Sequence, residues 1–245
     1  KFSPMAEIDF FSWLDDNKTL KTTIPDPTKK DFKTVLTDKK QITTGVNYKG
    51  TYGPISSLIE VAYQAGIQNQ IDPTSGKTSQ TDNIGAYLGS AQVFYSPLKE
   101  LKFGFGADIV SGDPSGKING AFETLYGTNH LFYGYMDYFI NVAGNTRNLG
   151  LNDFYFTSSW KRDDFPLSAS LNLHHLMSNK ASTDGSNTFG QEGDLILKYK
   201  LMDNSVLSLG ICGFLPSNLM KSADFFGPKN TEPSYWSYLM VTANF

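Results

Sequence analysis

The sequence predicts an all-β protein, an antiparallel transmembrane β-barrel, and three observations lead to this prediction. Many segments alternate apolar and polar residues with the period of two that puts successive side chains on opposite faces of a strand. Aromatic residues make up 14% of the chain, although its mean hydropathy is only −0.30. Short turns and long polar links also alternate between the strands. A barrel with one lipid-facing and one water-facing surface combines all three features.

Ten segments have this alternation, and most are long enough for a tilted strand of about 9–11 residues to cross a bilayer. In residues 101–109, Phe105 and Ile109 share one face, whereas Lys102 and Asp108 share the other. The predicted strands are 5–14, 40–50, 55–68, 83–96, 101–112, 150–161, 166–177, 191–202, 205–215 and 234–245. The side chains expected to face lipid are Val61, Phe103, Phe105, Ile109, Leu195, Leu197 and Leu209.

The connections between these strands are of two kinds, which alternate along the whole chain. The short turns lie at 49–54, 96–100, 161–165 and 202–204. The long polar links lie at 15–39, 69–82, 113–149, 178–190 and 216–233. Outer-membrane barrels have this asymmetry, with short periplasmic turns and long outer loops. We therefore expect all long links at one end of the barrel, and we expect the protein in the outer membrane of a Gram-negative bacterium, surrounded by membrane lipid.

Composition and charge argue against several other classes. The net charge is −3 and the arginines are Arg147 and Arg162, so nucleic acid is not an expected partner. The single cysteine, Cys212, rules out an intrachain disulfide framework and a cysteine metal site. No run approaches the ~18 apolar residues of a membrane-spanning helix. We expect no cofactor and no metal.

The last predicted strand ends in an aromatic residue, Phe245, and places Leu239, Val241 and Ala243 on the same face. A terminal aromatic residue on an amphipathic last strand is typical of the signal that the barrel-assembly machinery reads. This machinery is therefore an expected partner. The alternative for this segment is a soluble strand that ends in phenylalanine, and the alternative for the whole pattern is a large soluble all-β protein.

Several motifs occur in order from about residue 40 to the end of the chain. The most specific are S-G-D-P at 111–114, T-L-Y-G-T-N-H-L-F-Y-G-Y-M-D-Y-F at 124–139 and G-L-N-D at 150–153. Others are T-Y-G at 51–53, A-Y-Q-A-G at 62–66, G-Q-E-G-D-L at 190–195, F-L-P-S-N-L-M-K at 214–221 and W-S-Y-L-M-V at 236–241. Together they resemble the alginate-export family of outer-membrane barrels, especially its Bacteroidota-type members.

The resemblance implies a barrel of about eighteen strands, of which this chain would supply the C-terminal ten. A genuine ten-stranded barrel is the alternative, since ten is also an allowed even number. In either case the chain is expected to form a single barrel domain over residues 1–245.

The polar faces of the predicted strands define the expected lumen. Its acids are Glu7, Asp9, Glu60, Asp108, Asp153 and Asp194, and its bases are Lys49, Lys102, Lys161, Lys198 and Lys200. The predicted pore-lining residues are Glu60, Lys102, Asp108, Asp153, Asp194, Lys198 and Lys200. Because a conduit for polyanionic alginate needs fixed positive charge, this near balance favours a channel for small polar solutes or oligosaccharides. Alternatively, these charges form ion pairs between neighbouring strands and select nothing.

The link 113–149 is too long and too apolar for an ordinary hairpin loop. We expect residues 124–139 to fold into the barrel interior or over its mouth and to narrow the pore. The predicted constriction residues are Tyr126, Asn129, His130, Tyr133, Tyr135 and Asp137. Two alternatives stay open: a lid that only braces neighbouring loops, and an additional strand over 130–139.

Catalytic chemistry is the rival interpretation, although the prediction is that the protein is not an enzyme. His174 and Asp194 lie near the outer ends of neighbouring strands and are a possible general-base pair of a rim protease or a phospholipase. His174 and His175 point to opposite faces, which disfavours a zinc site. A third class is a structural barrel whose lumen is plugged.

Three acids of the long link, Asp113, Glu123 and Asp137, have oxygen ligands of the kind that calcium prefers. Their spacing matches no standard calcium loop. We therefore do not expect a calcium site there.

Overall fold

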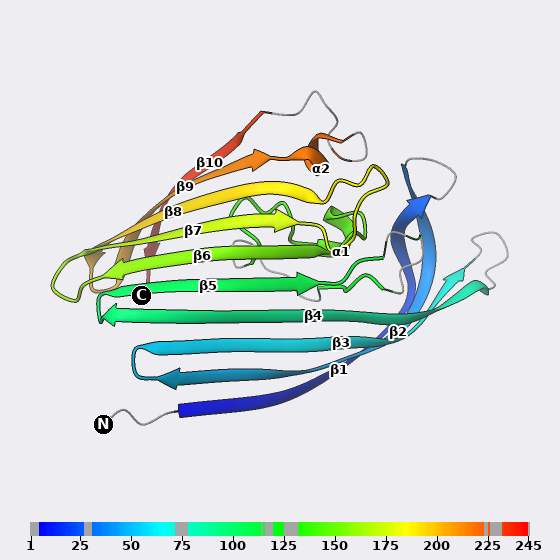
Figure 1. Ribbon diagram of the computed structural model, residues 1–245, viewed down its shortest axis with the longest axis horizontal. Helices are drawn as coiled ribbons and strands as arrows, with labels where there is room; N and C mark the ends of the chain where they lie inside the picture. Colours follow the sequence, from blue (N-terminus) through cyan, green and yellow to red (C-terminus); the bar gives the residue numbers. More distant parts are fainter. Residues whose placement is uncertain are drawn as a thin grey trace.

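The computed structural model describes residues 5–26, 31–71, 78–113, 115, 120–124, 132–222, 225 and 232–244. In this part of the chain, ten strands form one antiparallel sheet in sequence order (Figure 1). The predicted all-β class and the ten strands are confirmed. Each strand is hydrogen-bonded to the next along the chain, so the sheet is a continuous meander.

The strands are β1 (Met5–Asp26), β2 (Asp31–Tyr52), β3 (Ile55–Ile71), β4 (Thr78–Leu98), β5 (Leu101–Val110), β6 (Leu151–Lys161), β7 (Leu167–Met177), β8 (Thr188–Met202), β9 (Ser205–Pro216) and β10 (Ser234–Ala243). Two single-turn helices, α1 (Val142–Asn145) and α2 (Asn218–Lys221), lie in the links that follow β5 and β9. Among the described residues, no helix is long and apolar enough to cross a lipid bilayer.

The connections alternate between the two ends of the sheet as predicted. The tight turns after β2, β4, β6 and β8 lie at one end, and the longer connections lie at the other (Figure 1). The prediction of a long polar link over 15–39 is wrong, because β1 and β2 stay paired as far as Asp26 and Asp31. This stretch is mostly polar, and its apolar residues, such as Leu20, Ile24 and Phe32, are too widely spaced to give a clear alternation. Backbone hydrogen bonds between strands do not depend on such a pattern.

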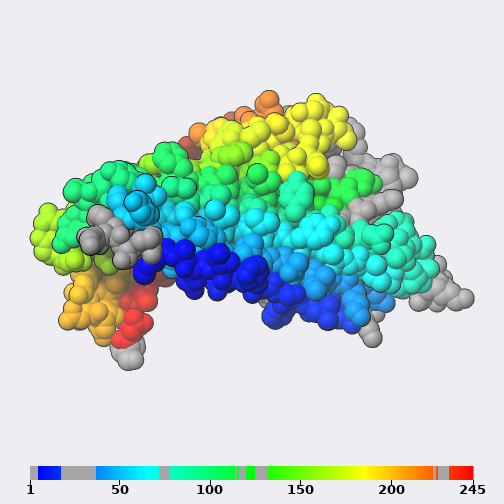
Figure 2. All heavy atoms as spheres, turned by 60° about the horizontal axis from the view of Figure 1, so that its bottom comes forward, coloured from blue at the N-terminus to red at the C-terminus, as the bar shows by residue number. Residues whose placement is uncertain are grey.

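The sheet is strongly curved, and its two borders are β1 and β10 (Figure 1). Within the described residues these two strands do not pair with each other, so the sheet is an open wall. Figure 2 shows part of the outer face, on which β1 to β4 run side by side without a break. Below, the concave side is called the inner face and the convex side the outer face.

The strand register confirms the predicted facing. Phe105 lies opposite Val93, Val61 opposite Gly89 and Leu197 opposite Leu209, all on the outer face. Apolar side chains on this face are solvent-exposed, with 67% exposure for Phe105 and 51% for Val61. The same is true of Ile8, Phe10, Ile59, Tyr63, Tyr95, Ile109, Leu195, Ile211, Leu239 and Val241. Soluble monomers rarely expose an apolar surface of this extent.

The hydrophobic core lies on the inner face, at the end of the sheet where the longer connections are. Val110, Leu151, Leu176, Phe189 and Phe214 project from β5 to β9 into this core. Residues of the links pack on top of them and complete it; these are Phe122, Tyr133, Phe139, Val142, Leu149, Leu219 and Met220. The sheet therefore exposes its apolar outer face and covers one end of its inner face with its own links.

Candidate functional site

The connection between β5 and β6, residues 111–150, crosses the inner face of the sheet and is called the strap below. Its described parts include residues 120–124 and 132–149. Phe122, Tyr133 and Phe139 are only 5%, 8% and 1% exposed. The expected packing of this connection against the inner face is therefore seen in its described parts. Residues 132–139 form turns and bends, so the additional strand considered for 130–139 is absent from these described residues.

One attachment of the strap is made to β2 and β3 through Glu123. The Gln64 side chain donates from Nε2 to the Glu123 carbonyl oxygen at 2.8 Å, and its Oε1 accepts from the Glu123 N–H at 2.9 Å. Gln64 is buried, and it pairs with the strap backbone much as a neighbouring strand would. The Glu123 carboxylate also forms an ion pair with Lys39. The amide and the ion pair fix residues 122–124 over the first strands.

A second attachment is made to β8, on the other side of the inner face. Glu192 accepts a hydrogen bond from the Met136 N–H at 2.6 Å, and Asp194 accepts one from the Tyr135 N–H at 3.3 Å. Gly134 lies beside this contact with φ of +90°, and a Cβ atom there would overlap the Glu192 carboxylate. The turn can therefore reach the two carboxylates only with glycine at position 134.

Aromatic rings continue this second attachment towards α1 and α2. The Phe139 ring lies 4.9 Å from the Phe189 ring, and the Tyr138 ring lies 4.7 Å from the Phe214 ring, measured between centroids. Phe225 meets Phe189 edge-on at 5.4 Å. These centroid distances are those of favourable aromatic pairs.

Beneath the strap, an imidazole lies between two carboxylates. His174 Nδ1 is 2.8 Å from Asp153 Oδ2, and His174 Nε2 is 3.9 Å from Asp194 Oδ2. The predicted proximity of His174 and Asp194 is therefore correct, but Asp153 is the nearer partner. Both carboxylates are fully buried and the His174 side chain is 10% exposed, so the strap covers this group.

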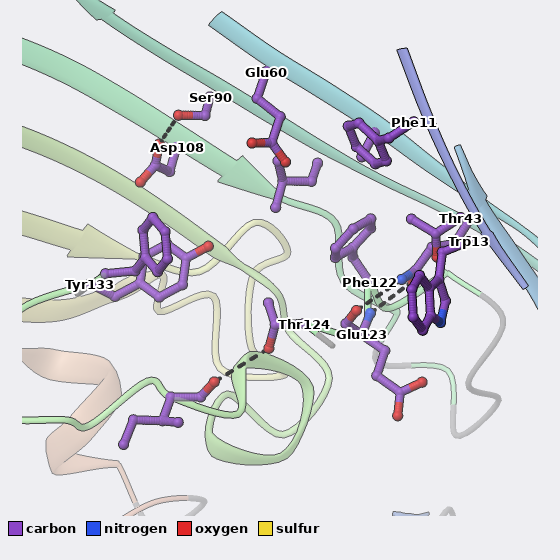
Figure 3. Close-up of a pocket in the computed structure, with 15 residues that line it drawn as sticks. Phe11, Trp13, Thr43, Glu60, Ser90, Asp108, Phe122, Glu123, Thr124 and Tyr133 are labelled. Atoms are coloured by element: carbon purple, nitrogen blue, oxygen red, sulfur yellow. Dashed lines mark hydrogen bonds between the residues drawn. The ribbon is translucent and has the colours of Figure 1, made fainter. Parts of the chain in front are cut away.

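A cavity of about 590 Å³ lies between the strap and the inner face of the first five strands (Figure 3). Two β1 side chains, Phe11 and Trp13, form one wall, and Glu60 and Asp108 project from β3 and β5. The other described lining residues are Thr43, Ala62, Gln64, Leu88, Ser90, Phe122, Glu123, Thr124, Phe132, Tyr133 and Ile140. The lining is predominantly apolar and aromatic, with a few polar groups, as is usual for small-molecule sites.

The charged groups that line the cavity are all carboxylates, those of Glu60, Asp108 and Glu123. Asp108 Oδ1 accepts a hydrogen bond from the Ser90 hydroxyl at 2.5 Å. Burial, together with the nearby charge of Asp108, raises the pKa of Tyr133 above its ordinary value, so its hydroxyl keeps its proton. Among the described lining residues there is no lysine, arginine or histidine.

The predicted pore-lining residues all lie on the inner face, but they form two groups. Asp108, Asp153 and Asp194 are buried under the strap, and Glu60 is half-buried at the cavity. The lysines are exposed near the tight turns; they are Lys102, Lys198 and Lys200. The alternative of mutual ion pairs is wrong: among the described residues, no ion pair joins a predicted lumen acid to a predicted lumen lysine. Asp108, Asp153 and Asp194 lie nearer the longer connections, whereas Lys102, Lys198 and Lys200 lie nearer the tight turns. Glu7 and Lys49 are opposite each other in the register of β1 and β2, but their side chains form no ion pair.

Of the predicted constriction residues, Tyr126, Asn129 and His130 lie outside the described residues. Tyr133 lines the cavity, the Tyr135 backbone is held by Asp194, and Asp137 has a left-handed backbone with φ of 60°. Sequence reasoning missed Gln64, Glu192, Phe11, Trp13 and Phe122. Glu192 could have been found from the sequence. It lies two residues before Asp194 in the G-Q-E-G-D-L motif, so its side chain points to the same, inner face.

The possible calcium ligands do not come together. Glu123 pairs with Lys39, and Asp113 accepts the Ser115 N–H at 3.0 Å. Within the part of the chain that the structure describes, no three histidine, cysteine or acidic side chains are grouped to hold a metal ion.

Comparisons with known proteins find similarity at the level of solved structures only. No family model and no curated sequence matches the chain, so the resemblance to the alginate-export family stays a prediction. The crystal structure of Acinetobacter baumannii OccAB4 is similar over 95% of this chain, with 11% sequence identity and a TM-score of 0.41. The similar region is 62% of the OccAB4 chain, so this chain spans less than two thirds of that protein. At such low identity and TM-score, the similarity does not bear on function.

Proposed function

We propose that the protein is a β-barrel channel of a Gram-negative outer membrane, which passes small polar solutes or oligosaccharides, and that the strap is its constriction. The observation that carries the proposal is the strap itself. It is fastened to β3 through Gln64 and to β8 through Glu192, on two sides of one concave wall. A segment held in this way lies across the path of any solute that moves along the inner face.

The exposed apolar outer face supports a position in the membrane. Outer-membrane barrels present apolar side chains to lipid and polar ones to the lumen on alternate residues of each strand. In this chain Phe105 and Ile109 are exposed on the outer face, while Lys102 and Asp108 of the same strand lie on the inner face. The proposed partners are therefore membrane lipid outside and solute inside, with the barrel-assembly machinery as the insertion partner.

The open borders of the sheet favour a larger barrel. Unpaired strand edges are not tolerated in the hydrocarbon core, because their backbone N–H and C=O groups find no water. β1 and β10 each have one described neighbour, so further strands would have to join these borders. We therefore keep the larger barrel of about eighteen strands as the proposal, and the mass of the intact native protein tests it.

Spin labels test the membrane position directly. In a variant with Cys212→Ala, a nitroxide on cysteine at position 105 is expected to be accessible to oxygen dissolved in lipid and shielded from a water-soluble nickel complex. A label at position 102, on the inner face of the same strand, should show the reverse preference. Equal access of the nickel complex to both labels in proteoliposomes would contradict the proposed position.

Conductance tests the constriction. Deleting residues 124–139 is expected to give a clear rise in single-channel conductance, or a loss of solute discrimination, because it removes the middle of the strap. The matched control deletes residues 182–186 in the connection at the same end between β7 and β8, which does not cross the inner face, and should leave conductance unchanged. Far-ultraviolet circular dichroism identifies the folded variants.

Two other results have definite meanings. If the folded 124–139 deletion conducts like the intact protein, the strap does not form a constriction. If the intact protein conducts no solute and the deletion opens it, the barrel is a plugged structural one, which the extensive packing of Phe139 and Tyr133 would explain.

A further inference from the structure

We propose that the cavity beneath the strap binds organic cations, namely small molecules with an apolar or aromatic body and a protonated amine. The inference rests on the proposed function and deepens it, because it names the class of solute that the constriction would select. Its basis is the combination of negative charge and aromatic walls in one cavity (Figure 3).

The cavity holds uncompensated negative charge. Of its three described carboxylates, Glu123 is paired with Lys39, whereas Asp108 has only the neutral Ser90 hydroxyl as a hydrogen-bond partner. Within the described part of the chain, no donor or basic side chain pairs with the Glu60 carboxylate, which points into the cavity (Figure 3). A cation would satisfy the electrostatics of this space, and an anion would not.

The aromatic walls of the cavity determine which class of cation it can bind. Five aromatic side chains line the cavity, Phe11, Trp13, Phe122, Phe132 and Tyr133. The faces of such rings attract a cation through their quadrupole. Apart from the Tyr133 hydroxyl these walls offer no oxygen ligands, so they favour a cation with an apolar body over a hydrated inorganic ion. In an organic ammonium ion, the ammonium group hydrogen-bonds to the carboxylates, and the apolar part of the molecule packs against the rings.

The size of the cavity agrees with such a ligand. Its volume of about 590 Å³ exceeds what one small amine fills and lies in the range of small-molecule sites, roughly 300–1,000 Å³. A polyanion such as alginate would meet Glu60 and Asp108 without any described basic residue on the cavity wall. The cavity therefore favours a substrate class opposite in charge to the one that the family resemblance would suggest.

The test compares three probes that share one ring and differ in charge: 2-phenylethylammonium, 2-phenylethanol and phenylacetate. Their binding to the intact protein in detergent micelles is measured by isothermal titration calorimetry. The ammonium is expected to bind about tenfold or more tightly than the alcohol, as is usual for a hydrogen bond to a charged group. Phenylacetate is expected to show no saturable binding. Equal affinity for all three probes, or a preference for phenylacetate, would overturn the inference.

Two variants locate the site. Glu60→Gln keeps the shape of the side chain and is expected to weaken ammonium binding by about tenfold while leaving the alcohol unchanged. The matched control is Glu7→Gln, which removes an acid from the same face of the sheet but outside the cavity lining. If both variants bind the ammonium like the intact protein, Glu60 does not hold the cation and the inference is wrong.

Different results would contradict the proposed channel function and the proposed cation site. Binding in micelles does not require conduction, so a protein that binds the ammonium but passes no solute contradicts the proposed function alone. A protein that conducts but does not distinguish the three probes contradicts the cation site alone.

Discussion

Replacing Phe139 by alanine is expected to weaken the docking of the strap by about 3–5 kcal/mol, the usual cost of removing a buried phenylalanine. The Phe139 side chain is 1% exposed and packs on Phe189 in the core between strap and sheet. Its loss leaves a cavity that the rigid strand β8 cannot close. Because the strap is held over the sheet by this core, the effect should appear as local opening of the strap.

Hydrogen exchange in the native state measures that opening. The Thr146 N–H donates to the Val142 carbonyl of α1, at 2.9 Å, and Thr146 is a buried residue of the strap itself. Its exchange rate should rise by on the order of 10²–10⁴ in Phe139→Ala. The control is Phe165→Ala, in the exposed turn between β6 and β7, which should leave this rate nearly unchanged. A rise of the same size in both variants would mean that Phe139 does not anchor the strap.

Replacing Gly134 by alanine is expected to release the attachment of the strap to β8. The residue has φ of +90°, and its new Cβ would overlap the Glu192 carboxylate, which accepts the Met136 N–H. The left-handed backbone alone costs about 1–2 kcal/mol for a residue with a Cβ. Losing a buried hydrogen bond to a charged group adds to this, so the total should be about 2–4 kcal/mol.

A substitution at a second glycine separates the cost of the left-handed backbone from the cost of the overlap with Glu192. Gly185 has φ of +84°, and nothing lies within 4 Å of the position of its Cβ, so Gly185→Ala has the backbone cost without the overlap. Exchange of the Met136 amide and single-channel conductance are the measurements. Gly134→Ala should raise both, and Gly185→Ala should raise neither. If Gly134→Ala leaves the Met136 amide protected, then the contact with Glu192 does not hold the strap.

Local alternation was enough to predict the strands and their two faces. Phe105 and Lys102 were assigned to opposite sides of the sheet from the sequence, and the register places them so. The physical reason is that neighbouring side chains of a strand always point to opposite faces, so the pattern is a local property. Where the sequence is mostly polar, as over 15–39, the few apolar residues did not reveal a strand, and the extended pairing of β1 with β2 was not predicted.

The strap was predicted only in part. Its apolar composition indicated that it must pack, and Phe139 and Tyr133 are indeed buried. Its attachments could not be predicted, because Gln64 and Glu123 are 59 residues apart and no local pattern links them. The alternative of ion pairs between lumen acids and lysines was wrong for a related reason: alternation shows which face a charge occupies, but not how far along the strand it lies or how its side chain is oriented.

The sequence by itself determined the class of the fold, the order and facing of ten strands, and the fact that residues 113–149 are too apolar to remain in water. These properties depend on residues close together in the chain. The tertiary structure alone decided that the strap crosses from β3 to β8, that His174 lies between Asp153 and Asp194, and that a cavity forms between Glu60 and Tyr133. Each of these depends on where the curvature of the sheet brings distant strands, and that curvature is set by the register and twist of the whole sheet rather than by any one segment.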